Sequence, residues 1–188
     1  MEKRPAAPSE GWLGPDEYWA AAGLRRGEMG FEPPRGVTRI EARPGLDHFV
    51  LPTPGPPKDL ARVFRPLTDA GVSVDLVKLH ENGLHFALSS SEAPRAQQVL
   101  AGLGYQLQPT PNCAIITVYA PDMRSIPGIM GRIVSALQHA GVAILETDDS
   151  YNCVFCLIEC DQTRAACAAL ASEFGLEAEA TEGPIVEW

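Results

Sequence analysis

Two stretches of the sequence repeat one spacing of apolar residues. Both place an apolar residue at the first, fourth, fifth and eighth positions, and this spacing predicts one buried face of an α-helix. These residues are Leu60, Val63, Phe64 and Leu67 in the first stretch, and Met130, Ile133, Val134 and Leu137 in the second. Gly71 and Gly141 follow the two stretches, where a left-handed residue would end each helix. Short β-rich runs lie before and after both stretches, so the sequence predicts alternating strands and helices.

The similarity between the two stretches extends over a repeat of 44 residues. The segment from Pro57 aligns with the segment from Pro127 at a constant offset of 70 residues and without a gap. Each copy reads as strand, helix, two hairpin strands, helix and a short closing strand, at 105–108 and at 176–180. This predicts an α+β fold of two ferredoxin-like β-α-β-β-α-β units, with antiparallel sheets that carry their helices on one face. Pro66 lies inside the first predicted helix and predicts a kink or an early break there.

The repeat also predicts the domain boundaries. Residues 37–111 would form the first unit and residues 112–182 the second. An N-terminal extension at 1–36 and a short tail at 183–188 lie outside them. A chain of 188 residues is long enough for two such small domains, each with its own core.

Acidic residues are concentrated in the second half of the chain. Residues 112–188 contain 3 Lys and Arg against 11 Asp and Glu, and the whole chain has a net charge of −9. An acidic surface repels phosphate, which argues against nucleic acid and against a membrane surface as partners. No apolar run approaches the ~18 residues of a membrane helix. Residues 1–30 do not read as a signal peptide, so we expect a cytoplasmic protein.

The cysteines offer one candidate metal motif. Cys153, Cys156 and Cys160 form C-x2-C-x3-C, a spacing that occurs in metal and cluster sites. They lie in the β-rich run NCVFCLIEC, and side chains of a strand alternate between its two faces. Cys153 and Cys156 would therefore point to opposite sides of the sheet, so we expect no metal at these cysteines.

The sequence contains no recognisable catalytic constellation. It has no G-x-x-x-x-G-K-[ST], G-x-G-x-x-G or H-E-x-x-H motif and no nucleophile elbow. Its four histidines, His48, His80, His85 and His139, are scattered, and each is expected to be a surface or partly packed residue rather than a base. We therefore expect no catalytic residue, no metal site and no cofactor.

The segment PDMRSIPGIMGRI, at Pro121–Ile133, reads as a loop that opens a helix on Pro127 and Gly128. A helix N-terminus presents unpaired N–H groups and a partial positive charge, which together can hold a carboxylate. Gly128 would let a ligand approach the backbone closely. The strand that begins after Gly141 would add backbone groups for an amino group. On this hypothesis Gly128→Val would abolish ligand binding and leave the fold intact.

The same segment carries a family resemblance. The run MRSIPGIMGRIVSALQHAGVAILETDDS, followed by ALASEFGL, resembles the second ACT unit of the aspartate kinase regulatory region. The first repeat resembles the first ACT unit, and VTRIEARPGLDHFVL resembles the segment that leads into the pair. In that family the lead-in strand, here 37–43, often joins the sheet of the second unit. The chain thus resembles a free-standing regulatory part, such as a small β subunit.

The resemblance implies a non-catalytic regulatory module of amino-acid biosynthesis. Paired ACT units bind lysine or threonine at interfaces between units, usually across a dimer. The implied partners are an amino-acid effector and either a second copy of the chain or a biosynthetic enzyme, with allosteric regulation of a lysine- or threonine-pathway enzyme as the outcome. The residues that correspond to effector-binding positions are Met123, Arg124, Ser125, Ile126, Pro127, Gly128, Ala143, Ile144, Ser73 and Asp75.

Two alternatives stay open. Ser73 and Ala143 stand where the family commonly has asparagine, and this favours a degenerate ACT protein. Such a protein would serve as a dimerisation or protein-interaction module without a ligand. An enzyme of small-molecule metabolism on a ferredoxin-like scaffold is the third reading, because a fold does not determine a function.

Overall fold

The structure is a computed structural model. It describes residues 36–52, 60–81, 83–105, 107–121 and 123–176 of the chain. All described residues belong to Arg35–Trp188, one of the two parts into which the chain divides. The expected N-terminal extension up to residue 35, the first repeat's loop at 53–59 and the C-terminal tail therefore lie outside the described residues.

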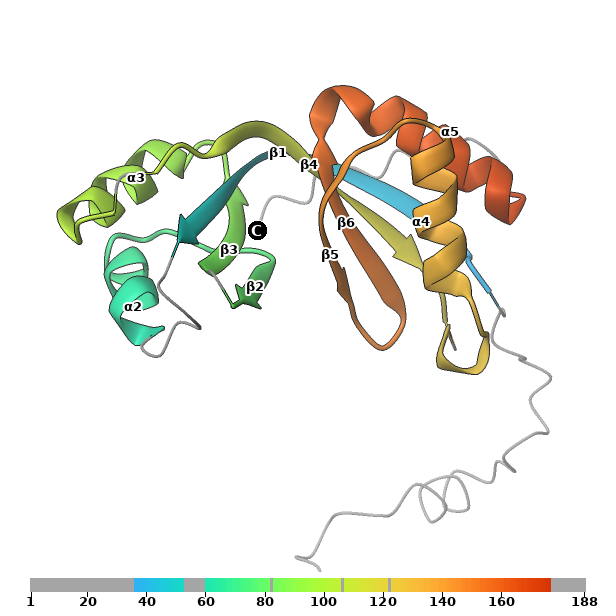
Figure 1. The fold of residues 1–188 in the computed structure, drawn as a ribbon, viewed down its shortest axis with the longest axis horizontal. Helices are drawn as coiled ribbons and strands as arrows, with labels where there is room; N and C mark the ends of the chain where they lie inside the picture. The colour runs from blue at the N-terminus through green and yellow to red at the C-terminus, as the bar shows by residue number, and fades with distance from the viewer. Residues whose placement is uncertain (1–35, 53–59, 82, 106, 122, 177–188) are drawn as a thin grey trace, which may run out of the picture. The chain divides into compact units, whose positions relative to one another are not determined.

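Six strands form one antiparallel sheet in the order β2-β3-β1-β4-β6-β5 (Figure 1). The strands are β1 (Arg39–Pro52), β2 (Val77–His80), β3 (Gly83–Ser89), β4 (Thr110–Tyr119), β5 (Ile144–Asp149) and β6 (Cys153–Glu159). The helices are α2 (Ala61–Asp69), α3 (Ala93–Gly102), α4 (Ile129–His139) and α5 (Thr163–Phe174). In the described residues no helix combines the length and the apolar character that a membrane crossing requires.

The elements form two α/β units that each pack helices on one face of an antiparallel sheet. In chain order the first unit is β1-α2-β2-β3-α3 and the second is β4-α4-β5-β6-α5. Figure 1 shows α4 and α5 side by side over the strands of the second unit. Each unit has a core of its own, and apolar residues such as Phe86 in β3 and Ile133 in α4 are fully buried there. The predicted pair of ferredoxin-like units is confirmed.

The two units share strand β1. Its first part, from Arg39 to Arg43, pairs with the second unit's strand β4, and its last part, from Leu46 to Pro52, pairs with the first unit's strand β3. The register shifts between the two parts, where Gly45 adopts a left-handed φ of 83°. The start of β4 in turn pairs with β1, with Leu46 opposite Cys113. Each unit therefore contributes part of a strand to the sheet of the other, and the sheet is continuous through both units.

The structure reproduces the sequence repeat closely. β6 begins and ends 70 residues after β3, and α5 begins 70 residues after α3. Gly71 and Gly141 adopt φ angles of 69° and 72° just after the first helix of each unit, as predicted. These positions need glycine because a side chain would strain the left-handed backbone.

Two details of the predicted units are wrong. The described residues at 105–108 form no strand, and the chain next enters the sheet in β4 at Thr110. The reason is that the start of β4 occupies the edge of β1 beside which the first unit's closing strand would lie. Of the kink or early break predicted at Pro66, the early break is wrong, because α2 continues to Asp69. The second closing strand, at 176–180, lies outside the described residues except for Leu176.

The face of the sheet that carries no helices is covered by other strands of the same sheet. Leu46, Ala87, Cys113, Ile115 and Leu157 form a third buried cluster there, which contains residues of both units. Side chains of β2 and β3 also contact side chains of β5, although β2 and β5 are the two edges of the sheet. The sheet must therefore curl so that the bare faces of the two units meet.

Candidate effector-binding site

The connection from β4 to α4 is a short, anchored loop. It contains a single 3-10 turn at Met123–Ser125. The N–H of Met123 donates to the carbonyl of Ala120 at 3.0 Å, and the N–H of Ile126 donates to the carbonyl of Met123 at 3.1 Å. Met123 and Ile126 are half-buried and pack against the second unit's core. The two apolar side chains fix the loop, while Arg124 and Ser125 between them and Pro127 after them are exposed.

The loop ends at a helix start that no side chain of the described residues caps. Gly128 is the N-cap residue of α4 and has a left-handed φ of 85°. The N–H of Arg132 donates to the carbonyl of Gly128 at 2.9 Å, which is the first turn of the helix. Among the described residues no atom lies within 4 Å of a Cβ placed on Gly128. The backbone is therefore open to an approaching group, and the N–H groups of the first turn and the positive helix end suit a carboxylate.

Arg124 adds a cation beside this helix start. Its guanidinium carbon lies 5.2 Å from the ring centroid of Tyr151, in the turn between β5 and β6. The Tyr151 side chain is 68% exposed, so the cation–π contact is worth only about 0.5–1 kcal/mol. The contact orients Arg124 without neutralising its charge. The charge is thus available to a second partner such as a carboxylate.

The strand start after Gly141 is less open than the sequence predicts. The N–H of Ala143 donates to Oε1 of Gln162 at 3.0 Å, and Ile144 is half-buried against the second unit's core. A ligand group at Ala143 would have to displace the Gln162 amide. The equivalent position of the first unit behaves alike, because the N–H of Ser73 donates to Oε2 of Glu92 at 3.3 Å.

Ser73 and Asp75 belong to the first unit, in the segment between α2 and β2. The Asp75 carboxylate pairs with the guanidinium of Arg43, at 3.0 Å between Oδ1 and Nη2. The structure thus brings Met123–Gly128 together as one surface in the second unit. Ser73 and Asp75 mark the corresponding surface of the first unit, whose loop lies outside the described residues.

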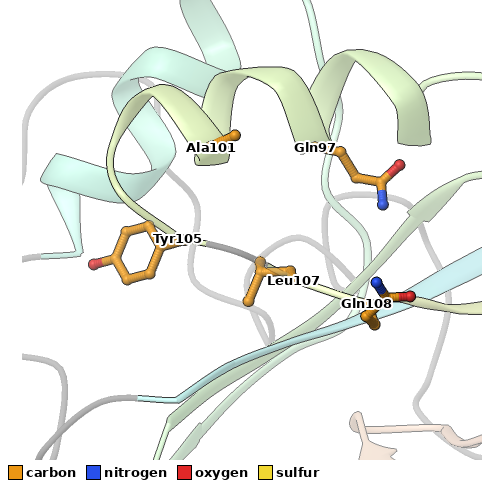
Figure 2. Close-up of a pocket in the computed structure, with 5 residues that line it drawn as sticks. All are labelled: Gln97, Ala101, Tyr105, Leu107 and Gln108. Carbon is orange, nitrogen blue, oxygen red and sulfur yellow. The ribbon is translucent and has the colours of Figure 1, made fainter.

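A shallow pocket lies elsewhere, between α3 and the segment that follows it (Figure 2). Its volume is about 440 Å³, and Gln97, Ala101, Tyr105, Leu107 and Gln108 line it. These side chains provide amide and phenol groups but no charge. A free amino acid carries two charges that need partners when they leave water. We therefore do not assign this pocket to an amino-acid effector.

The structure adds a group of residues that sequence reasoning missed. His48, His80 and His85 are distant in sequence, but all three surround the carboxylate of Glu146. The expectation of scattered histidines is wrong for these three and fits only His139, which lies at the end of α4. The hairpin turn between His80 and His85 could have predicted that both side chains lie on the same face of the sheet. No sequence signal points to Glu146, because it comes from the other unit.

The cysteines are mostly buried thiols. Cys113, Cys153, Cys156 and Cys167 are buried, and Cys160 is partly exposed. Burial raises the pKa of the Cys156 thiol to about 12 and that of Cys113 to about 11. Both thiols are therefore protonated at neutral pH.

The architecture is that of a tandem pair of ACT-type, ferredoxin-like domains. Residues 108–172 match the family model described as ACT domain. Aspartokinase 1 of Bacillus subtilis (strain 168) is 30% identical over 96 residues, which cover 51% of this chain and 24% of that protein. The chain thus spans about a quarter of the length of this curated relative.

Solved structures of aspartate kinases share the fold. Aspartate kinase from Synechocystis matches with a TM-score of 0.72 and 22% identity, over 87% of this chain and 30% of that chain. The regulatory subunit of aspartate kinase from Thermus thermophilus matches with a TM-score of 0.68 and 20% identity, over 74% of this chain and 99% of that chain. The expected resemblance to the aspartate kinase regulatory region is confirmed.

Proposed function

We propose that the chain is a non-catalytic regulatory module that binds a small amino acid of the lysine or threonine type. The β4–α4 loop would hold the carboxylate of this effector. The observation that supports this most is the uncapped start of α4 at Gly128, beside the charge of Arg124. The likeness to a regulatory subunit of aspartate kinase supports the regulatory role.

The proposed site would be completed by a second ACT-type unit. Arg124, Ser125, Pro127 and Gly128 are exposed, so one unit alone would leave the ligand largely in water. Small-molecule sites usually bury most of their ligand. The missing wall would come from a second copy of the chain or from a biosynthetic enzyme. Effector binding would then be coupled to assembly, which gives the module a means of allosteric regulation.

One observation supports a second function, that of a degenerate module without a ligand. The N–H groups of Ala143 and Ser73 are already bonded to Gln162 and Glu92. In a degenerate module these internal bonds would replace those to an effector, and the fold would serve only for dimerisation or protein interaction. The two functions differ in whether any amino acid binds.

Calorimetric titration with each of the twenty amino acids tests the proposal. Arg124→Ala should weaken binding of the effector, and Arg164→Ala, an exposed arginine on α5, is the matched control. Assembly should be followed in parallel by light scattering with and without the effector. If no amino acid binds while a stable dimer forms, the degenerate module is the correct reading.

A further inference from the structure

Three of the four histidines of the chain converge on one buried carboxylate. His48 lies in β1, His80 at the end of β2, His85 in β3 and Glu146 in β5. Nδ1 of His85 lies 2.5 Å from Oε1 of Glu146, and Nε2 of His48 lies 3.5 Å from the same oxygen. Nε2 of His80 lies 3.5 Å from the other carboxylate oxygen. This group, the His–Glu cluster, shares no residue with the proposed effector loop.

Strand register explains why the histidines share a face. His48 is opposite Ala87 in the pairing of β1 with β3, and His85 lies two residues from Ala87 on the same strand. His85 is opposite Lys78 in the pairing of β3 with β2, and His80 lies two residues from Lys78. Side chains two residues apart in a strand point to the same side. All three imidazoles therefore project from the sheet face without helices, where β5 of the second unit meets them.

His48 is the least satisfied member of the cluster. Its side chain is 6% exposed, and among the described residues its Nε2 atom has no hydrogen-bond partner. The distance of 3.5 Å to Glu146 is beyond an ordinary hydrogen bond. A buried polar atom without a partner costs about 1–3 kcal/mol, so such atoms are rare unless another group binds them.

The Glu146 carboxylate needs a cation. Its side chain is only 8% exposed, and a buried negative charge is costly unless it is paired. Lys78 is close by, on the same face as His85, but its ammonium is bonded to Asp148 at 2.7 Å. The groups that face Glu146 directly are imidazoles. A metal ion held between these imidazoles and Glu146 would neutralise the carboxylate and would use the Nε2 atom of His48.

We propose that His48, His85 and Glu146 bind a divalent transition-metal ion of the Zn²⁺ class, with His80 as the fourth ligand. One ligand atom from each of His48, His85 and Glu146 lies within 4.8 Å of the others. In a tetrahedral site with bonds of about 2.0–2.2 Å the ligand atoms lie about 3.3–3.6 Å apart, so small movements of these three side chains would bring them to one ion. His80 lies outside this group of three and would move towards the ion as the fourth ligand. Imidazole with one carboxylate suits Zn²⁺, Co²⁺ or Ni²⁺ rather than Mg²⁺ or Ca²⁺.

The ion would join the two units. His48, His80 and His85 belong to the first unit, and Glu146 belongs to the second. A metal bound to both units stabilises their contact, because it binds the folded arrangement and not the separated strands. The site is therefore structural, and the fourth position is taken by a histidine that is partly exposed and accessible to an incoming ion.

Titration of the chelator-treated, full-length protein with ZnCl₂ tests the proposal. Calorimetry should show a single ion per chain, and Co²⁺ should give a tetrahedral absorption spectrum without the thiolate band that cysteine ligands produce. Zinc should also raise the thermal midpoint. His85→Gln and His80→Gln should each weaken binding at least about tenfold, the size of effect seen even for residues behind a metal ligand.

Two matched variants serve as controls. His139→Gln alters the remaining histidine, which lies on α4 and bonds the carbonyl of Ser135, and Cys160→Ser alters the partly exposed thiol. Both should bind zinc like the wild type. Because His80 is 46% exposed, its substitution leaves the buried cluster in place and should fold normally. Equal zinc affinity in wild type and His80→Gln and His85→Gln, a thiolate band with Co²⁺, or no binding by a folded wild type would overturn the proposal.

Discussion

The Nζ atom of Lys78 lies 2.7 Å from Oδ1 of Asp148, and the two residues occupy the same position of the repeat, 70 residues apart. Lys78 is in β2 and Asp148 is in β5, the two edges of the sheet. An approximate twofold relation between the two units would bring equivalent residues into contact in this way. Ala87 and Leu157, also equivalent, lie in one buried cluster. Lys78 and Asp148 thus carry opposite charges at equivalent positions where the two units meet.

This ion pair predicts a modest, salt-sensitive coupling between the units. A double-mutant cycle with Lys78→Gln and Asp148→Asn should give a coupling free energy of about 0.5–1 kcal/mol in denaturant unfolding. The value stays small because the side chains are 28% and 37% exposed. The coupling should fall at high ionic strength. A coupling free energy of zero at low salt would show that the ion pair contributes nothing to stability.

The shared sheet predicts that both units unfold together. Leu157 is fully buried in the cluster between the units, so Leu157→Ala should lower the free energy of unfolding by about 2–5 kcal/mol. The variant should retain one transition by both circular dichroism and calorimetry. Leu79→Ala is the control, because this side chain is 58% exposed and should change stability by less than about 0.5 kcal/mol. Two separate unfolding transitions would show that the two units unfold independently.

The structure predicts a different outcome for Gly128→Val from the intact fold that the sequence predicts. At a φ of 85° any side chain strains the backbone, by about 1–2 kcal/mol for ordinary residues. Gly128→Val should therefore destabilise the start of α4 and cannot be expected to leave the fold intact. Gly128→Asn is the useful comparison, because asparagine tolerates this conformation better. We expect the valine variant to have the lower thermal midpoint, and equal midpoints would contradict the left-handed N-cap.

The His–Glu cluster predicts a loss of stability in mild acid when metal is chelated. The pKa of His48 is lowered in the folded chain, chiefly by burial, while Glu146 opposes this and His85 and His80 add to it. The unfolded chain therefore binds the proton more tightly. The stabilising contribution is complete above pH 6.5 and is lost as pH falls below it, with a slope of up to about 1.4 kcal/mol per unit.

Unfolding free energies measured between pH 8 and pH 5 check this. His48→Gln should flatten the profile below pH 6.5, and His139→Gln should leave it unchanged. A wild-type profile that is as flat as that of His48→Gln would contradict the role of burial at His48.

The local pattern of the chain predicted most of each unit but not how the units combine. Helical spacing and the glycines at 71 and 141 identified the helices and their ends, because these features depend on neighbours in sequence. Strand β1 divides its pairing between two units, and that choice depends on partners that lie about 35 and 70 residues further along the chain. The absence of a closing strand among the described residues at 105–108 has the same origin.

The candidate sites also differ in how far the sequence could predict them. The β4–α4 loop could be predicted because Pro127 and Gly128 mark a helix start within a few residues. The bonds from Ala143 to Gln162 and from Ser73 to Glu92 could not, because each spans 19 residues and depends on how a helix packs. The His–Glu cluster was missed for the stronger reason that the curled sheet alone brings β5 to β3.

Backbone amide exchange with and without the effector tests whether the start of α4 holds the ligand. Lysine, threonine or another small amino acid should slow exchange at Ile129, Met130 and Gly131, the first turn of α4. Amides around Tyr105 and Leu107, in the shallow pocket of the first unit, should be unaffected and serve as an internal control. If an amino acid binds while the first turn of α4 exchanges at its original rate, the ligand is not held by the β4–α4 loop.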